Sequence, residues 1–330
     1  MSAFAPTLEG FFTQRLINQK RASSHTIAAY RDTFRLLLGF ASRRTGKPPC
    51  DLDFGDLDAV LIGVFLDHLE HGRHNSIRTR NSRLAAIHSL YRYAALEHPE
   101  HAGLIGRVLA IPTKRAERTD IAFLEPEEVD ALLAAPDRTR WVGRRDHALL
   151  VTAIQTGLRV SELTGLCCAD VHLGRGPHLR CEGKGRKLRA TPLTAHTVSV
   201  LQVWLAERTA VPGDPLFPTS RGRRLSPDAV AALVAKHTTT ARQSRPTLQT
   251  KHVTVHTLRH TAAMNLLRAG VEATVISLWL GHEDVETTTK IYLHADMTIK
   301  ERALARTTPP GTTPGRYKPP DHLLAFLDTL

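Results

Sequence analysis

The chain has 330 residues, which is long for one ordinary domain and suits two, and its 42% hydrophobic content is enough for packed cores. Aromatic residues make up only 5%, so we expect cores built mainly from Leu, Val, Ile and Ala. The 44 Lys and Arg residues outnumber the 32 Asp and Glu residues, and the charge of +12 favours nucleic acid over a membrane surface because the basic residues are spread along the whole chain.

The sequence contains no export signal and no membrane span. Residues 1–10 lack a basic start followed by an apolar run, and no stretch reaches the ~18 apolar residues that a spanning helix needs. We therefore expect a cytoplasmic protein with no membrane partner. The cysteines form no C-x-x-C pair, so free thiols are expected at Cys50, Cys167, Cys168 and Cys181.

The first 112 residues show helical periodicity. Apolar residues recur at steps of three and four over 8–19, 56–70 and 76–96, and over a helix that starts after Ser23 and Ser24, either of which can cap it. Pro, Gly and basic residues make 98–120 a connector. We place a first domain at 1–112 and a basic linker at 113–122. The basic residues that face solvent or a phosphate are Arg78, Arg80, Arg83, Lys114 and Arg115.

The second domain, 123–306, is predicted to be mainly helical with one small sheet. Pro126 suits a helix start, and Gly157 should end the apolar helix 146–155. Residues 179–182 and 188–191 read as two strands joined by a lysine-bearing tip. Further helices are predicted at 194–208, 226–240, 257–269 and 272–280. A Pro- and Thr-rich tail, 307–330, ends in an apolar segment.

Three separate segments carry residues suited to phosphodiester chemistry: TGLRVSEL at 156–163, VHTLRH at 255–260 and LGHEDVETTTKIYLH at 280–294. Arg159 and Arg259 can each offer a planar fork of N–H donors to phosphate oxygens. Tyr292 is a poor nucleophile by itself, because a tyrosine hydroxyl ionises near pH ~10, and it needs such helpers.

These segments closely resemble the tyrosine recombinase, or phage integrase, family. The family motifs are T-G-[LM]-R-x-x-E-L, H-x-L-R-H, a hairpin lysine, L-G-H and Y-x-H. The matching residues here are Arg159, Glu162, Lys184, His256, Arg259, His282 and Tyr292. Residues 24–30 and 81–87 resemble, more loosely, the helical core-binding (SAM-like) domain of the family. The resemblance implies a C-shaped clamp on DNA.

The resemblance also implies the reaction. Tyr292 attacks a DNA phosphate to form a 3′-phosphotyrosyl link, and no cofactor is needed because the bond energy is retained. Lys184 protonates the leaving 5′-oxygen, with Lys187 as a close competitor, while Arg186 and Lys187 also suit DNA contact. His256 assists proton transfer and His282 hydrogen-bonds the phosphate. Glu162 supports the site.

Other interpretations are weaker. His256 and His260 have the spacing of helical zinc ligands, but Thr257 replaces the glutamate of H-E-x-x-H and no third ligand is evident, so no metal is expected. A related single-subunit topoisomerase shares the attack chemistry. A DNA-binding protein without catalysis would keep the fold but need not keep all seven residues.

Within the family the biological role stays open. The resemblance implies a homotetramer that acts on two double-stranded DNA duplexes, at a specific recombination site, through a Holliday junction. The chain begins at once with the core-binding helices, which leaves no room for an arm-binding domain. The tail favours integration, excision or transposition of a mobile element over Xer-type dimer resolution. Family recombinases often lend a C-terminal segment to a neighbouring subunit, and 321–330 suits that role.

Overall fold

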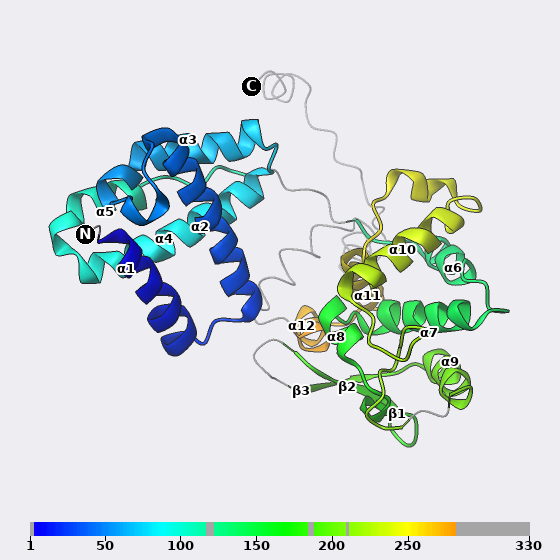
Figure 1. The fold of residues 1–330 in the computed structure, drawn as a ribbon. Helices are drawn as coiled ribbons and strands as arrows, with labels where there is room; N and C mark the ends of the chain where they lie inside the picture. Colours follow the sequence, from blue (N-terminus) through cyan, green and yellow to red (C-terminus); the bar gives the residue numbers. More distant parts are fainter. Residues whose placement is uncertain (1–2, 117–121, 184–187, 209–210, 282–330) are drawn as a thin grey trace, which may run out of the picture. The chain divides into compact units, whose positions relative to one another are not determined.

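The computed structural model describes residues 3–116, 122–183, 188–208 and 211–281 (Figure 1). The chain divides into two compact units, Met1–Thr119 and Asp120–Leu330. Both are helical, and the second also contains a small sheet. The mainly helical fold class is therefore confirmed. Among the residues that the structure describes, no helix is long and apolar enough to cross a membrane.

The first unit is a bundle of helices whose starts and ends follow local signals. The Ser23 side chain accepts a hydrogen bond from Thr26 N, and Ser76 does the same for Thr79 N, so each serine caps a helix. Gly46, with φ of +74°, ends the first of these. The elements are α1 (Phe4–Gly10), a π-helical stretch (Phe11–Gln19), α2 (Ser24–Thr45), α3 (Ala59–Asp67), a second π-helical stretch (His68–Gly72), α4 (Ile77–Glu97) and α5 (Ala102–Leu109).

Helix α5 corrects the sequence prediction, which placed a connector over 98–120. Ile105 and Val108, three residues apart, are both buried and give this short helix an apolar face. The imidazole of His88 on α4 hydrogen-bonds Val108 O at 3.0 Å. Gly103 and Gly106 suggested a loop, but the packing of this face outweighs their weak helix propensity.

The core of the first unit is built mainly from Leu, Ile, Val and Ala, as the composition predicts, but it also gathers seven aromatic residues. A low aromatic fraction says nothing about where those residues gather. Phe11 lies at the centre of a cluster in which its ring contacts Phe12, Tyr30, Phe34 and Tyr93. The buried aromatic residues of this unit are Phe4, Phe11, Phe34, Phe40, Phe54, Phe65 and Tyr91.

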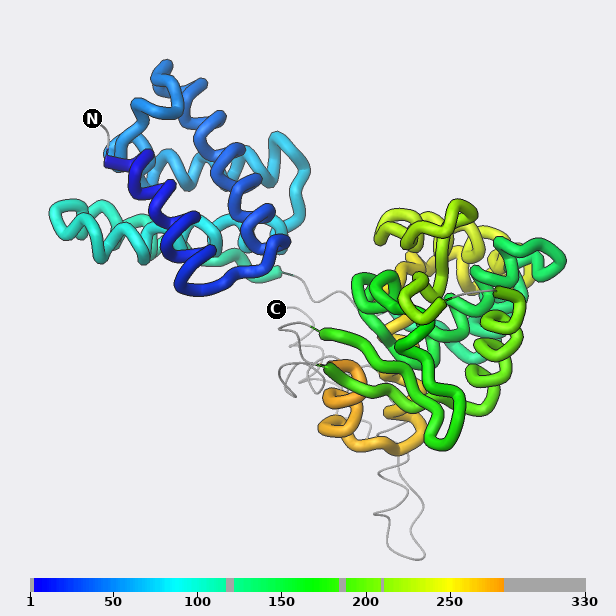
Figure 2. Tube along the Cα trace, turned by 60° about the horizontal axis from the view of Figure 1, so that its bottom comes forward, coloured from blue at the N-terminus to red at the C-terminus, as the bar shows by residue number. Residues whose placement is uncertain are grey.

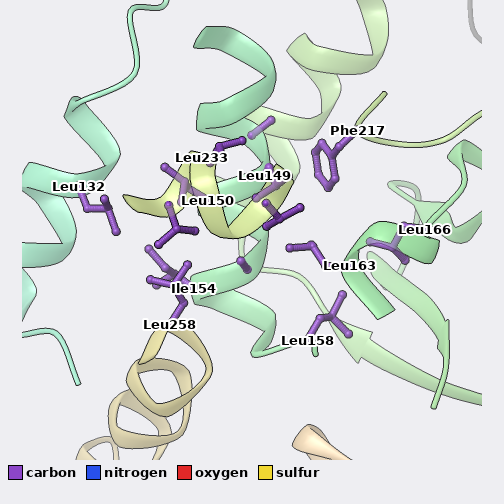
Figure 3. Close-up of a cluster of buried hydrophobic side chains, with 14 of the residues drawn as sticks. Leu132, Leu149, Leu150, Ile154, Leu158, Leu163, Leu166, Phe217, Leu233 and Leu258 are labelled. Atoms are coloured by element: carbon purple, nitrogen blue, oxygen red, sulfur yellow. The ribbon is translucent and has the colours of Figure 1, made fainter. Parts of the chain in front are cut away.

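The second unit packs its helices around α7 (Trp141–Thr156), where all but four of the residues are buried. Leu149, Leu150 and Ile154 of α7 meet Leu258 and Leu233 from other helices in the core (Figure 3). The remaining helices are α6 (Pro126–Ala134), α8 (Val160–Gly165), α9 (Ala195–Ala206), α10 (Pro227–Ala241), α11 (Val255–Arg268) and α12 (Ala273–Leu280).

The sheet has three antiparallel strands in the order β1, β2, β3. The predicted hairpin is present as β2 (His178–Glu182) and β3 (Leu188–Pro192), whereas the two-residue strand β1 (Val171–His172) was not predicted. Cys181 pairs with Arg189 across the hairpin. Both views show the hairpin beside α12, so β3 can reach the end of that helix (Figure 2).

Candidate active site

The candidate active site forms where α7, α11 and α12 come together at Gly157. This residue has φ of +64°, a left-handed conformation that favours glycine. A Cβ here would lie 2.6 Å from Leu280 Cδ2 and 3.1 Å from Ala262 Cβ. The absence of a side chain therefore allows the end of α7 to approach both other helices closely.

Arg259 projects from α11 into this junction and is buried, with 3% of its surface exposed. Its Nη1 donates to Gly157 O and its Nη2 donates to Leu280 O, both at 2.7 Å. The first of these bonds joins residues that are 102 positions apart in the chain. Arg259 therefore fastens the end of α7 to the end of α12.

Arg159 reaches the same end of α12 from the residue that caps α8. Its Nη2 donates to Gly281 O at 2.7 Å, so the two arginines hold the consecutive carbonyls of Leu280 and Gly281. A cation at a helix C-terminus is stabilised by the negative end of the helix dipole. The Arg159 side chain remains 32% exposed, which leaves part of its guanidinium open to solvent.

Glu162 is the buried anion of the site, with a side chain only 3% exposed. Its carboxylate accepts hydrogen bonds from Arg159 N and Arg159 Nη1, at 2.7 and 2.8 Å. Burial raises its pKa, but hydrogen bonds from Arg189 and Arg159 outweigh burial and hold the pKa below its usual range. Glu162 is thus a carboxylate that fixes the guanidinium of Arg159.

Arg189 was not identified from the sequence as part of the site. It stands on β3, and its Nη1 and Nη2 donate to the two carboxylate oxygens of Glu162, both at 2.8 Å. The alternation of β3 in the sequence carried no such signal, because apolar Leu188 and Ala190 are exposed while Arg189 and Thr191 point to the more buried face. One carboxylate therefore orients two arginines.

His256 lies one turn before Arg259 on α11, and its side chain is exposed. The surrounding protein and the positive charges of Arg259 and Arg159 lower its pKa below the ordinary value. The imidazole is therefore neutral at pH 7 and can accept a proton. Its ring meets that of His260 edge to face, with centroids 4.3 Å apart.

Five predicted site residues lie outside the described residues: Lys184, Arg186, Lys187, His282 and Tyr292. Four of them border the site in sequence, because His282 follows Gly281 and the other three lie in the 184–187 segment between β2 and β3. The structure thus brings together Arg159, Glu162 and Arg259, with His256 on the same helix as Arg259. No cluster of three or more His, Cys, Asp or Glu side chains among the described residues could hold a metal ion.

The basic residues predicted to contact DNA in the first unit differ in their surroundings. Arg78 and Arg115 are exposed, whereas Lys114, also exposed, donates to Glu70 Oε2 at 2.8 Å. Arg80 has a different role from the one predicted. It is 5% exposed and its Nη1 donates to Pro112 O at 3.1 Å, so it anchors the chain after α5 instead of facing a phosphate.

Arg83 lines a hollow of about 380 Å³ on the first unit together with Arg78. The hollow lies between α2 and α4, and Thr79 and Ser82 add hydroxyl groups to it. The Nη1 atom of Arg83 is buried and has no hydrogen-bond partner among the described residues. This surface therefore presents an unsatisfied cationic donor.

Both units match known protein families. Residues 122–298 match the phage integrase family, and residues 10–98 match the phage integrase N-terminal SAM-like domain. The chain therefore belongs to the phage integrase family, the tyrosine recombinases that break and rejoin DNA. The resemblance drawn from the sequence motifs is confirmed.

Individual relatives agree with this assignment. An integrase/recombinase of Sinorhizobium fredii, y4rC, is 56% identical and covers 100% of this chain and 99% of its own length. The tyrosine recombinase XerC of Pelobacter propionicus is 33% identical over 92% of this chain and 95% of its own. The structure of a lambda integrase tetramer bound to a Holliday junction has the same fold, with 16% identity, coverage of 87% and 76%, and a TM-score of 0.61.

Proposed function

We propose that this protein is a site-specific recombinase that cleaves DNA with Tyr292 and rejoins it through a 3′-phosphotyrosyl intermediate. The observation that supports this most directly is the convergence of Arg159 and Arg259 on consecutive carbonyls at the end of α12. The chain continues from there to Tyr292, eleven positions beyond Gly281. Two forked cations thus bind the last described residues before the segment that carries the proposed nucleophile.

The chemistry follows from the side chains. Arg159 and Arg259 neutralise the charge that builds on the phosphate oxygens as the tyrosine oxygen approaches phosphorus. His256, neutral at pH 7, accepts the tyrosine proton, and His282 hydrogen-bonds a phosphate oxygen. The P–O5′ bond breaks as Lys184 or Lys187 protonates the leaving oxygen. In the second step a 5′-hydroxyl attacks phosphorus and releases the tyrosine, so no cofactor is required.

A nicked suicide substrate that carries the recombination site tests this reaction, because the cleaved strand diffuses away and the covalent adduct accumulates. We expect the wild-type protein to form an adduct and Tyr292→Phe to form none. Absence of the adduct with wild-type protein, or its persistence in Tyr292→Phe, would reject the proposal. Relaxation of any supercoiled plasmid by a monomer would instead indicate a topoisomerase.

We further propose that the recombinase serves integration, excision or transposition of a mobile element from the cytoplasm. The support is the full-length relative named integrase/recombinase, which is far more similar than XerC. The similarity to XerC supports the second candidate role, which is the resolution of chromosome or plasmid dimers. Sequencing the DNA that is covalently trapped on the protein in its host separates the two. Recovery of the ends of a mobile element would support the first role, and recovery of a single chromosomal locus would support the second.

Binding to double-stranded DNA is proposed to use both units as a C-shaped clamp, with domains at 1–112 and 123–306 joined by the basic linker 113–122. Arg83 and Arg78 supply unsatisfied or exposed donors in the first unit. Lys114, Arg115, Arg186 and Lys187 complete the proposed set of phosphate contacts. We do not retain Arg80 in this set because it is buried against Pro112.

We propose a homotetramer on two duplexes, in which 321–330 of one copy docks on the second unit of its neighbour. An apolar cavity of about 340 Å³ suits this segment, which contains Leu323, Leu324, Phe326 and Leu327. Gln155 Oε1 and Trp279 Nε1 line the cavity and are buried, with no hydrogen-bond partner among the described residues. A peptide backbone could satisfy both.

Deletion of 321–330 should impair tetramer formation more than DNA binding. Leu266→Glu, which places a charge in the cavity, should have the same effect. Leu278→Glu is the matched control because Leu278 is 77% exposed and does not line the cavity. Light scattering of the DNA complexes measures assembly. Normal tetramers from both the deletion and Leu266→Glu would contradict this docking.

A further inference from the structure

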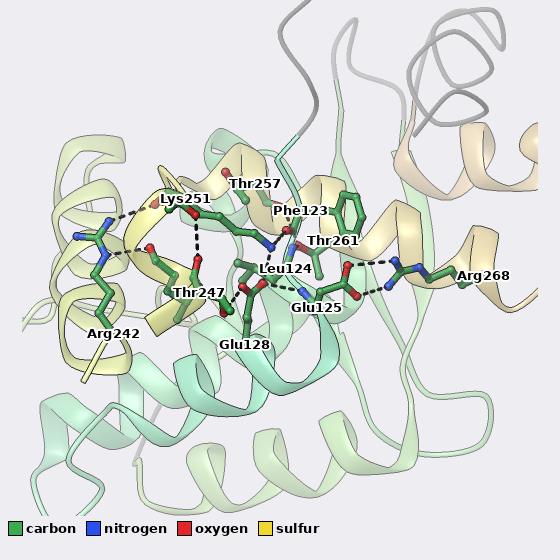
Figure 4. Close-up of polar contacts among 12 residues, drawn as sticks. Phe123, Leu124, Glu125, Glu128, Arg242, Thr247, Lys251, Thr257, Thr261 and Arg268 are labelled. Atoms are coloured by element: carbon green, nitrogen blue, oxygen red, sulfur yellow. Dashed lines mark hydrogen bonds and ion pairs between the residues drawn. The ribbon is translucent and has the colours of Figure 1, made fainter. Parts of the chain in front are cut away.

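The segment Phe123–Glu125 is bound to the middle and the last turn of α11 (Val255–Arg268), the helix that carries His256 and Arg259 (Figure 4). In the middle of the helix, Leu124 N donates to Thr261 Oγ1 at 2.9 Å. At its last turn, Arg268 donates to both carboxylate oxygens of Glu125, at 2.6 and 3.2 Å. This segment is also where the chain arriving from the first unit meets the second.

Lys251 makes the corresponding contacts near the first turn of α11. Its Nζ donates to Phe123 O at 3.0 Å and to Glu128 Oε2 at 2.6 Å. The Phe123 ring also lies under two cations, Lys251 Nζ at 5.9 Å and the Arg268 guanidinium at 5.0 Å. Lys251 thereby joins the incoming segment to the first residues of α6.

The acceptor of Lys251 is itself held firmly. The Glu128 side chain is only 4% exposed and also accepts from Glu125 N at 2.9 Å and from Thr247 Oγ1 at 2.7 Å. On the other side, Arg242, the C-cap residue of α10, donates to Lys251 O at 3.1 Å. The lysine is therefore fixed at its backbone and at its ammonium group, although a quarter of its side chain remains exposed, at 26%.

The position of Lys251 in the chain connects these contacts to the reacting groups. It lies four residues before Val255, the first residue of α11, and the intervening turn is closed by Thr257 Oγ1, which donates to His252 O at 3.2 Å. Displacement of Lys251 would shift the start of α11, and with it His256 and Arg259. Displacements of about 1 Å are enough to reduce catalysis about 100-fold.

We propose that Lys251 is a positioning residue for DNA cleavage. Lys251 connects Phe123–Glu125 and α6 to the turn before α11. It thereby determines the positions of His256 and Arg259 on that helix, and it links the incoming chain to the candidate active site. The inference rests on the proposed function, since the reaction it affects is cleavage by Tyr292.

The test must separate positioning from stability, because Lys251→Met alone leaves the buried Glu128 carboxylate without its cation. The double variant Lys251→Met with Glu128→Gln removes that unpaired charge while still breaking the link to Phe123 O. Lys251→Arg keeps a cation and long donor and serves as the rescue variant. Arg144→Gln, which breaks the bidentate ion pair with Glu207 between α7 and α9, is the matched control.

Three quantities are measured for each variant: the unfolding midpoint in urea, the affinity for the recombination site, and the single-turnover rate of adduct formation on the suicide substrate. For the double variant we expect an affinity within about twofold of wild type and a cleavage rate lower by about 10- to 100-fold. Lys251→Arg should recover most of the rate, and Arg144→Gln should cleave at the wild-type rate.

Wild-type cleavage by the double variant would overturn the role of Lys251. So would a loss of cleavage no larger than its loss of DNA affinity, since that pattern indicates a general structural defect. These results differ from failure of the proposed function, in which the wild-type protein itself forms no adduct.

Discussion

Glu162 hydrogen-bonds both arginines that flank it, and this single carboxylate therefore orients the guanidinium of Arg159. In Glu162→Gln the amide group would turn one N–H donor toward a guanidinium that also donates. We expect the free energy of unfolding to fall by about 3 kcal/mol, as for a broken buried ion pair. Cleavage should fall further than stability explains, because Arg159 loses its orientation.

Urea denaturation and adduct formation measure the two effects of Glu162→Gln separately. Glu182→Gln is the control, because Glu182 is an exposed carboxylate at the end of β2 on the same sheet. If Glu162→Gln cleaves as fast as Glu182→Gln, Glu162 does not orient Arg159 for the reaction.

His147 predicts a pH dependence of stability. Burial lowers its pKa and outweighs the hydrogen bond to Leu133 O, so the folded protein favours the neutral ring. The contribution of His147 to the free energy of unfolding is fully present above the pKa of the unfolded state, about 6.5. It is lost as the pH falls through the lower pKa of the folded state. Unfolding free energy measured from pH 7.5 to 5 should therefore decrease, with a shallower slope in His147→Gln. The slope should not change in His25→Gln, which alters an exposed histidine.

At the scale of elements, the site depends on how closely the ends of α7 and α12 approach. Gly157→Ala should cost about 3 kcal/mol, of which about 1 kcal/mol is the left-handed backbone and the rest is the clash with Leu280 and Ala262. Gly176→Ala isolates the backbone part, because Gly176 has φ of +66° and nothing within 4 Å of a Cβ. Equal losses of unfolding free energy in the two variants would show that the close approach costs nothing.

Helix periodicity and capping were enough to predict most elements, because each helix carries its own apolar face and its own cap, as Ser23 and Ser76 do. The hairpin could also be predicted from the sequence. The convergence of Arg159 and Arg259 could be predicted through the family motifs. Helix α5 was missed because its glycines resemble loop residues. Arg189 and Lys251 were missed because a periodic pattern shows which face is buried and not which partner it meets, and Arg189 finds Glu162 27 positions away.

At the scale of the whole molecule, the charge of +12 is the property that most directly constrains function. It is the excess of 44 basic over 32 acidic residues, and some of the basic residues are neutralised locally. Arg144 pairs with Glu207, Lys114 with Glu70 and Arg268 with Glu125, so these cations already have anionic partners. The arginines available for phosphate are the exposed or unsatisfied ones, among them Arg78 and Arg83. The number of basic residues thus overstates the number of phosphate contacts, which the salt dependence of DNA binding measures.

Each cation that neutralises a phosphate releases condensed counterions, so the logarithm of the affinity should fall with the logarithm of the salt concentration, by about 0.9 per contact. Arg78→Gln should weaken binding at low salt and reduce the magnitude of this slope by about 0.9. Arg144→Gln removes the same charge from a residue that is already paired and should leave the slope within error of wild type. Fluorescence anisotropy with one labelled duplex, from low to high salt, measures both slopes. If the two variants change the slope equally, bulk charge and not the surface between α2 and α4 sets the affinity, and Arg78 is not a phosphate contact.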